Sequence, residues 1–430
     1  MISAPNIYKC VIVLIAALQL SYNLSAQDPG WDQGHRPEGI KSVQLHREEW
    51  NLSYPIIELG SDEKLMLGFD LLGESIETYY YTFIHCDKDW NQSRVYESEY
   101  LEGFSENQIQ DYDMSFNTTV NYIHYSLSFP NDDVSFKISG NYIIRVYPFG
   151  EPDAPVITRR FMISEGAAPI TATTLRSKLT GYYQTGQQVD FKVNHASLDI
   201  QDPYNNIYST ILQNGRWDNA RKNLKPDFTG NYSLEYNGLS DLNIFPGGSE
   251  YRYFDIKSIR YQSEYIQNIE NIFGYYHVEL RESNNRAARQ YFYWQDFNGK
   301  YYIAHQEGID PDTDADYVYV YFTLPSNFPI DNDVYIFGEL TGWSFSEENR
   351  MHYNAESTAY ECRLLLKQGW YNYMYAVKNE SLSASIFSKF EGDHYETEND
   401  YIILTYYRNP NGRYDRLIGH QMVNTLNPQR

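Results

Sequence analysis

Apolar and polar side chains alternate along several separate stretches of the chain. The runs at residues 65–71, 123–129 and 318–324 each carry an apolar residue at every second position. A β-strand points successive side chains to opposite faces, so a period of two gives one face for a core and one for solvent. The alternation therefore predicts antiparallel sheets with one buried face.

Composition supports this fold class and limits the function. At roughly 150 residues per domain, the 430 residues suggest about three domains. Aromatic residues make up 17% of the chain, with 43 tyrosines, and they favour strands over helices. The net charge of -23 is unsuited to electrostatic binding of nucleic acid or anionic lipid headgroups. We expect an all-β chain of tandem immunoglobulin-like β-sandwich domains that binds no nucleic acid.

The first 26 residues have the pattern of a secretory signal peptide. One early cation, Lys9, precedes the apolar run 11–18, and the small residue Ala26 follows. After Gln27 no run approaches the roughly 18 consecutive apolar residues of a membrane-spanning helix. We expect residues 1–26 to be a signal peptide that is removed on export.

Turn-rich segments divide the remaining chain into three blocks. A linker around residues 164–169 ends the first block, and an acidic run at 310–316 precedes the third. The expected domains are an N-terminal β-sandwich at 27–165, a middle β-sandwich at 167–306 and a C-terminal β-sandwich at 310–430.

Two short patterns predict local structure within these blocks. A Gly-x-Tyr occurs at residues 140–142, 230–232 and 369–371. In immunoglobulin-like sandwiches such a tyrosine can form a tyrosine corner, in which its hydroxyl binds the backbone just upstream. Asn214-Gly215 in the middle block predicts a type I′ hairpin turn.

The sequence contains no H-E-x-x-H, C-x-x-C, G-x-S-x-G or Walker motif. His85, Asp87 and Asp89 would share one face of a straight strand, but a structural hydrogen bond to the histidine is the more ordinary explanation. Cys86 and Cys362 lie too far apart in sequence to indicate a disulfide framework. We predict no catalytic residue, no small-molecule substrate and no cofactor.

One acidic run imitates a metal site. Asp310, Asp312, Asp314 and Asp316 resemble the start of a calcium loop, but Ala315 and Tyr321 stand where that loop needs Gly and Glu. A solvated acidic linker is therefore the preferred interpretation, and we predict no metal ligand.

Exposed aromatic residues are the candidates for contact with a partner. Tyr317, Tyr319 and Tyr321 project from one side of a strand whose other side already supplies core residues. This row either packs against the middle domain or faces a partner. Trp217, beside the Asn-Gly turn, and Trp343 are the remaining candidates.

A series of short motifs runs in order through the whole chain. The first block contains PIIELG at 55–60, LGFDL at 67–71, HCD at 85–87, YLEGF at 100–104 and SGNY at 139–142. Later blocks contain QNGRWDNA at 213–220, FPGG at 245–248 and VYIFG at 334–338. This ordered series resembles the plug protein family of the type IX secretion system of Bacteroidetes. The resemblance implies a periplasmic protein whose partner is the outer-membrane translocon pore protein, and which closes the periplasmic mouth of that pore until it is displaced.

The third block also resembles early-set β-sandwich modules that bind starch and glycogen, through residues 334–337, Gly342-Trp343 and 371–377. Those modules stack sugars on exposed aromatic side chains such as Trp343. Because domain shape is shared more widely than sugar binding, we attribute this likeness to the fold.

These patterns lead to one functional hypothesis with two alternatives. We expect a non-catalytic periplasmic plug, associated peripherally with the outer membrane through the pore and reversibly displaced during export. The first alternative is an exported carbohydrate-binding β-sandwich protein. The second is an exported glycoside hydrolase built from dispersed carboxylates.

Overall fold

A computed structural model describes residues 39–238, 240–378 and 385–427. The expected signal peptide, residues 1–26, lies outside this range. Within it, no helix is both long and apolar enough to cross a membrane. Nearly all regular structure consists of strands that pack as sandwiches, so the all-β prediction is confirmed.

The first domain is a sandwich of two sheets around one core that runs from Ile40 to Ile163. One sheet has the order β1 (Ile40–Arg47), β3 (Leu65–Leu72), β8 (Tyr122–Phe129) and β7 (Asp111–Met114). The other has the order β2 (Ile56–Glu58), β11 (Ile157–Ser164), β10 (Gly140–Pro148), β4 (Tyr79–Cys86) and β6 (Asn107–Gln108). Beside them lie α2 (Glu97–Tyr100) and the pair β5 (Leu101–Gly103) and β9 (Val134–Phe136).

The second domain combines strands that lie far apart in the sequence. One sheet contains β12 (Ile170–Arg176), β13 (Gly186–Asn194), β17 (Ser233–Tyr236) and β16 (Phe228–Gly230), with β18 (Ile244–Pro246) also on β13. The other has the order β15 (Arg221–Leu224), β14 (Ile207–Gln213), β28 (Asp400–Arg408) and β29 (Asp415–Asn424). The short helices η1 (Thr180–Tyr182) and α3 (Pro203–Asn206) lie in connections. The end of the chain therefore completes the middle domain.

The third domain is one long sheet folded over a core of its own. One side contains β19 (Arg252–Asp255), β27 (Gly369–Val377), β22 (Tyr301–Ile303) and β24 (Val334–Phe337). β25 (Arg350–Asn354) connects this side to β26 (Ala359–Lys367), β23 (Tyr317–Pro325), β21 (Tyr275–Leu280) and β20 (Ile266–Ile272). Its helices are α4 (Pro311–Asp314), η2 (Glu339–Thr341) and α5 (Ser385–Glu391).

The strand pairing corrects the expected division at residues 306 and 310. β19, β20 and β21 were expected in the middle domain but pair within the third, and β28 and β29 were expected in the third but pair with β14 of the second. The third domain is thus inserted between β18 and β28 of the second. Alternation identifies a strand but carries no information on which strand it pairs with, so a contiguous division was the wrong inference.

Two of the three predicted tyrosine corners are present. The Tyr142 hydroxyl donates to the carbonyl of Ile138 over 2.7 Å, and the Tyr371 hydroxyl donates to the carbonyl of Lys367. Tyr232 is 55% exposed in a turn with a φ of 58°, so the third prediction is wrong. At the Asn214-Gly215 turn φ is 55° and 71°, and the Arg216 amide donates to the Gln213 carbonyl over 3.1 Å. These values agree with the predicted type I′ turn.

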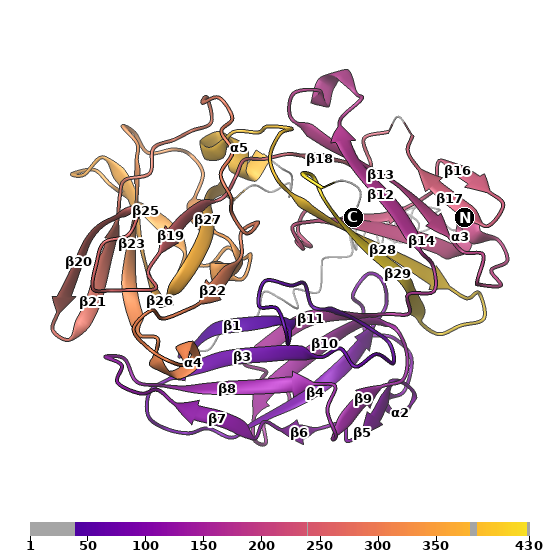
Figure 1. The fold of residues 1–430 in the computed structure, drawn as a ribbon, viewed down its shortest axis with the longest axis horizontal. Helices are drawn as coiled ribbons and strands as arrows, with labels where there is room; N and C mark the ends of the chain where they lie inside the picture. The colour runs from indigo at the N-terminus through magenta and orange to yellow at the C-terminus, as the bar shows by residue number, and fades with distance from the viewer. Residues whose placement is uncertain (1–38, 239, 379–384, 428–430) are drawn as a thin grey trace, which may run out of the picture.

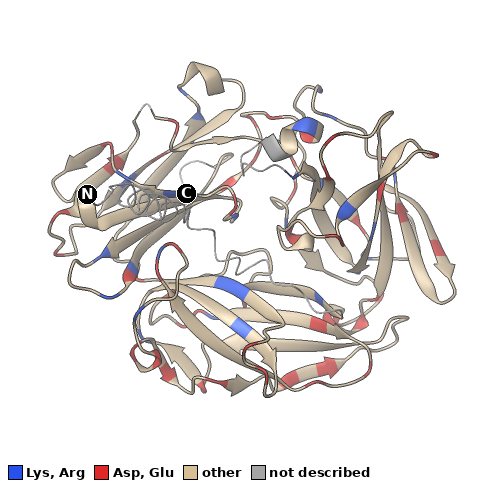
Figure 2. Cartoon of the chain, turned by 180° about the vertical axis from the view of Figure 1, so that it is seen from behind, with Lys and Arg blue, Asp and Glu red and all other residues tan. Residues whose placement is uncertain are grey.

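The three domains surround a common centre (Figure 1). The first domain lies at the bottom of that view, the third at the left and the second at the right, the last combining magenta strands with the yellow end of the chain. Acidic residues are spread over all three domains (Figure 2). Each domain contacts the other two, and these interfaces position the candidate site.

Candidate binding site at the junction of the three domains

A buried ionic group joins the first and third domains. Asp70 of β3 has no exposed surface, and its carboxylate accepts hydrogen bonds from Tyr317 over 2.6 Å and from Lys367 over 2.8 Å. His124 of β8 donates to the other oxygen over 2.7 Å. Burial acts to raise the pKa of Asp70, but Lys367 and His124 outweigh it and hold that pKa below its ordinary value. The first and third domains are therefore held by a fully desolvated ion pair.

The acidic run before β23 belongs to the same interface. Asp316 accepts hydrogen bonds from the Thr119 amide over 2.8 Å and the Thr119 hydroxyl over 2.7 Å, both in the first domain. Asp310 caps α4, and Asp314 accepts from the amides of Ile309 and Asp310. These carboxylates bind different donors and do not converge. The interpretation as a wholly solvated linker is wrong for Asp316, which is buried.

The interface between the first and second domains contains an apolar cluster. The cluster contains Trp90, Ile143 and Met162 of the first domain together with Leu212 and Ile402 of the second. At its edge the Trp90 and Trp217 rings meet edge to face, with centroids 4.9 Å apart. The cluster is continuous with neither domain's own core, so it serves to hold the two domains together.

His85 lies beside this interface and has a structural role. Its ring nitrogens contact the Ser93 hydroxyl at 2.7 Å and the Ser139 carbonyl at 3.2 Å. Burial lowers the pKa of His85 to about 4, so the ring is neutral near pH 7. Asp87 instead accepts hydrogen bonds from the amides of Asp89 and Asn91. The three residues do not form a catalytic set.

Two segments cross between the second and third domains, residues 247–251 and 392–399. They run side by side, because the His394 amide donates to the Gly248 carbonyl over 2.7 Å and the Gly248 amide donates to the Asp393 carboxylate over 2.8 Å. Glu250 in the first segment is fully buried and accepts from the Glu398 amide over 3.0 Å. Burial raises the pKa of Glu250 to about 7 and that of Asp393 to about 6.

Glu250→Gln should weaken the pH dependence of stability. The folded protein keeps a proton on Glu250 up to about pH 7, whereas the unfolded chain releases it near 4.5, so the free energy of unfolding falls as pH rises between these values. We expect the wild type to lose on the order of 2 kcal/mol more than the variant between pH 5 and pH 8. Urea unfolding at both pH values measures this, with exposed Glu356→Gln as the control. Equal losses in wild type and Glu250→Gln would contradict the assignment.

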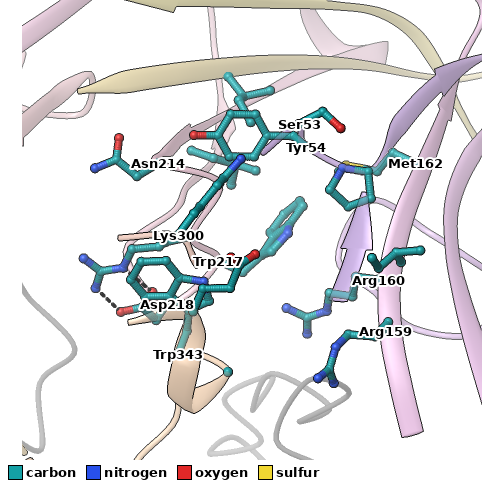
Figure 3. A pocket seen from close by; sticks show the side chains of 18 of the residues that line it. Ser53, Tyr54, Arg159, Arg160, Met162, Asn214, Trp217, Asp218, Lys300 and Trp343 are labelled. Carbon is teal, nitrogen blue, oxygen red and sulfur yellow. Dashed lines mark hydrogen bonds and ion pairs between the residues drawn. The ribbon is translucent and has the colours of Figure 1, made fainter. Parts of the chain in front are cut away.

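A cavity of about 180 Å³ lies where the three domains meet (Figure 3). The first domain contributes Tyr54, Arg159, Arg160 and Met162, the second contributes Arg216, Trp217 and Asp218, and the third contributes Lys300, Glu339 and Trp343. Trp217 and Trp343, two of the predicted contact residues, therefore line the same cavity. Their proximity depends on how the domains pack.

Lys300 is the most unusual group in this cavity. It is only 6% exposed, and its ammonium lies 3.4 Å from the centre of the Tyr54 ring and donates to the Leu52 carbonyl. Burial lowers the pKa of Lys300 to about 8, although Glu339 and Asp400 nearby oppose this shift. The third domain thus presents a desolvated cation to the first.

Arg216 is also buried, but its guanidinium already has a carboxylate partner. Its guanidinium binds both oxygens of Asp218, one over 3.0 Å, and lies 5.5 Å from the Trp343 ring centre. Trp343 packs in turn against Tyr251 and Phe337. The Trp343 side chain therefore serves mainly as packing between the second and third domains and is a poor platform for sugar.

The tyrosine row is divided between two environments. Tyr317 is buried against the first domain. The prediction that the row packs against the middle domain is therefore wrong for this residue. Tyr319 lies by His277 and Arg363, and the Tyr321 hydroxyl contacts His277 at 2.7 Å, all within the third domain. These two partly exposed tyrosines lie on the face opposite the domain core. They remain the predicted surface for a partner.

The fold defines a class of proteins with three β-sandwich domains that meet at a cavity. Residues 40–165 match the family described as type 9 secretion system plug protein 1st domain. A crystal structure of a hypothetical protein from Parabacteroides merdae is 37% identical with a TM-score of 0.86, covering 90% of this chain and 97% of that one. No curated protein matches. The chain belongs to the type 9 secretion system plug protein family, which assigns it to type IX secretion in the periplasm or at the outer membrane.

Proposed function

We propose that the protein is a non-catalytic plug that closes the periplasmic mouth of the type IX outer-membrane translocation pore and leaves it during export. The observation that carries this proposal is the way the family-matched first domain is fixed to the other two, through the Asp70 ion pair and the Trp90 cluster. Domains joined by flexible linkers move relative to one another unless their interfaces are extensive. Three domains with buried mutual contacts form a rigid unit that can cover an opening wide enough for folded cargo.

Tyr319 and Tyr321 supply a suitable surface for a reversible contact. Both tyrosines are partly exposed, and Arg363 is exposed beside them. Interfaces that form and dissociate are more polar than obligate ones, and tyrosine and arginine are enriched in them. The strand that carries them, β23, lies in the side of the third domain away from the second (Figure 1).

Affinity purification of the tagged chain from its own cell envelope tests the proposal. The wild type should recover the outer-membrane pore protein, and Tyr319→Glu with Tyr321→Glu should reduce that recovery at least tenfold while the melting temperature stays near wild type. Tyr232→Glu, exposed on the second domain, is the matched control and should recover the pore normally. Absence of the pore protein from wild-type eluates would refute the plug role. Normal recovery by the double variant would refute only the choice of surface.

A further inference from the structure

A cavity of about 390 Å³, larger than the one at the junction, lies mainly on the third domain. Pockets for drug-sized ligands usually measure roughly 300–1,000 Å³, so this cavity has room for a small molecule. Much of its lining comes from the connection between β21 and β22, residues 281–300, all of which are described and none of which lies in a helix or strand. A connection this long without regular structure is uncommon inside a compact domain, and such connections are usually binding loops, lids or linkers.

Several contacts hold this connection in place. The Arg286 amide donates to the Phe390 carbonyl over 2.8 Å, and the Trp294 indole donates to the Tyr251 carbonyl over 2.8 Å. The Arg286 guanidinium also lies 4.8 Å from the centre of the Trp294 ring. The connection is therefore packed on the domain and is not a linker, and the cavity beside it is preformed, as ligand sites usually are.

Two of the arginines that line the cavity are buried and already paired. The Arg252 and Arg286 side chains are 13% and 10% exposed, and both donate to the fully buried Glu391 carboxylate, Arg252 over 3.0 Å. Glu250 also acts on Arg286, although burial raises the pKa of Glu250 to about 7. These two arginines therefore fix the wall of the cavity and leave the binding of a ligand to other residues.

Two further arginines on the same lining are exposed and unpaired. Within the described chain, the guanidiniums of Arg281 and Arg289 have no hydrogen bond, ion pair or ring contact. The remaining carboxylate on the lining, Glu282, is exposed as well, so two cations oppose one anion there. Burial lowers the pKa of His394, so that ring is uncharged near pH 7. Because a guanidinium binds an oxyanion through two parallel N–H donors, this part of the lining favours an anionic ligand.

Six aromatic side chains make up much of the remaining lining, namely Tyr253, Tyr265, Tyr291, Phe292, Trp294 and Tyr373. Phe292 is 73% exposed and Tyr265 is 43% exposed, although both line the cavity. The Tyr265 ring is held edge to face against Tyr253, with centroids 5.0 Å apart. Aromatic side chains pack well against a second flat ring, in a stacked or an edge-to-face arrangement. The lining therefore suits a ligand that combines a flat ring with an oxyanion.

We propose that this cavity binds a small organic anion, in which Arg281 and Arg289 bind the oxyanion and the exposed rings of Tyr265 and Phe292 pack against a flat ring. An aromatic carboxylate and a nucleoside monophosphate share this chemistry, and the cavity has room for either. The inference concerns binding alone and assigns no reaction. It depends on the cavity of the third domain and holds whether or not the protein covers a pore.

Ligand-observed NMR and calorimetry on the full chain test the proposal. The probes are indole-3-acetate and adenosine monophosphate, each beside its neutral counterpart, indole-3-acetamide and adenosine. At least one anion should bind saturably and at least tenfold more tightly than its neutral counterpart, and the preferred anion identifies carboxylate or phosphate as the bound group. Acetate and inorganic phosphate, which have no ring, should bind at least tenfold more weakly than the preferred anion.

Variants locate the site. The double variant Arg281→Gln with Arg289→Gln should weaken binding by about tenfold or more, and Phe292→Ala should weaken it by about threefold or more. These side chains are exposed, so the melting temperature should stay near that of the wild type. Arg260→Gln and Phe328→Ala are the matched controls, because both side chains are exposed outside the cavity, and they should bind normally.

Four results would overturn the proposal. The first is a lack of saturable binding of either anion below about 20 mM. The second and third are equal binding of the neutral counterparts and equal binding of the ringless anions. The fourth is unchanged affinity in both the double arginine variant and Phe292→Ala.

Discussion

Asp70→Ala should lower the free energy of unfolding by about 3–5 kcal/mol, because it leaves Lys367 as a buried charge without its partner. The Tyr317 and His124 donors lose their acceptor at the same time. Urea unfolding followed by circular dichroism measures the change. The pair Lys192 and Glu235 provides the control, since both are partly exposed, and Glu235→Ala should cost less than about 1 kcal/mol.

The stability of Asp70→Ala should depend less on pH in the acid range than the stability of the wild type. The pKa of Asp70 lies below its ordinary value in the folded protein, so its contribution is fully present above about pH 4 and is lost as pH falls through the lower folded pKa. The difference between wild type and Asp70→Ala should therefore shrink below pH 4. A difference under about 1 kcal/mol at pH 7 would contradict an ion pair that joins the domains.

The sequence predicted strands well because the buried face of a strand is a local property. The alternating runs at 65–71, 123–129 and 318–324 correspond to β3, β8 and β23. Pairing is not local. β28 pairs with β14 nearly two hundred residues earlier, and no pattern in either strand specifies the other. The inserted third domain was therefore beyond prediction from periodicity.

The junction was only partly predictable for the same reason. Trp217 was singled out beside the Asn-Gly turn and Trp343 through the likeness to sugar-binding modules, but their meeting at one cavity depends on domain packing. Arg216 and Lys300 gave no signal, because an isolated cation in a loop is usually solvated. Asp70 lies on the face of β3 expected to be wet, and the third domain covers that face. Alternation distinguishes inside from outside within one domain and cannot distinguish solvent from a neighbouring domain.

Trp90→Ala should lower the free energy of unfolding by about 3–5 kcal/mol and should weaken the contact between the first and second domains. Trp90 has no exposed surface, and it packs against Trp217 and lies 4.8 Å from the Arg160 guanidinium. It belongs to the interdomain cluster and not to the core of the first domain. The first domain should therefore keep its fold while its coupling to the second decreases.

Unfolding experiments separate these two effects. The wild type should unfold in one main transition, whereas Trp90→Ala should show an earlier step in which interdomain contacts are lost, detected by circular dichroism and by proteolysis near residues 164–169. Trp50→Ala is the matched control, because that ring is 55% exposed. Its removal should change the free energy of unfolding by no more than about 0.5 kcal/mol. A single transition shifted by less than about 1 kcal/mol in Trp90→Ala would mean that the apolar cluster does not hold the domains together. The rigid unit on which the plug proposal depends would then have to come from the polar contacts between the domains, among them the ion pair at Asp70.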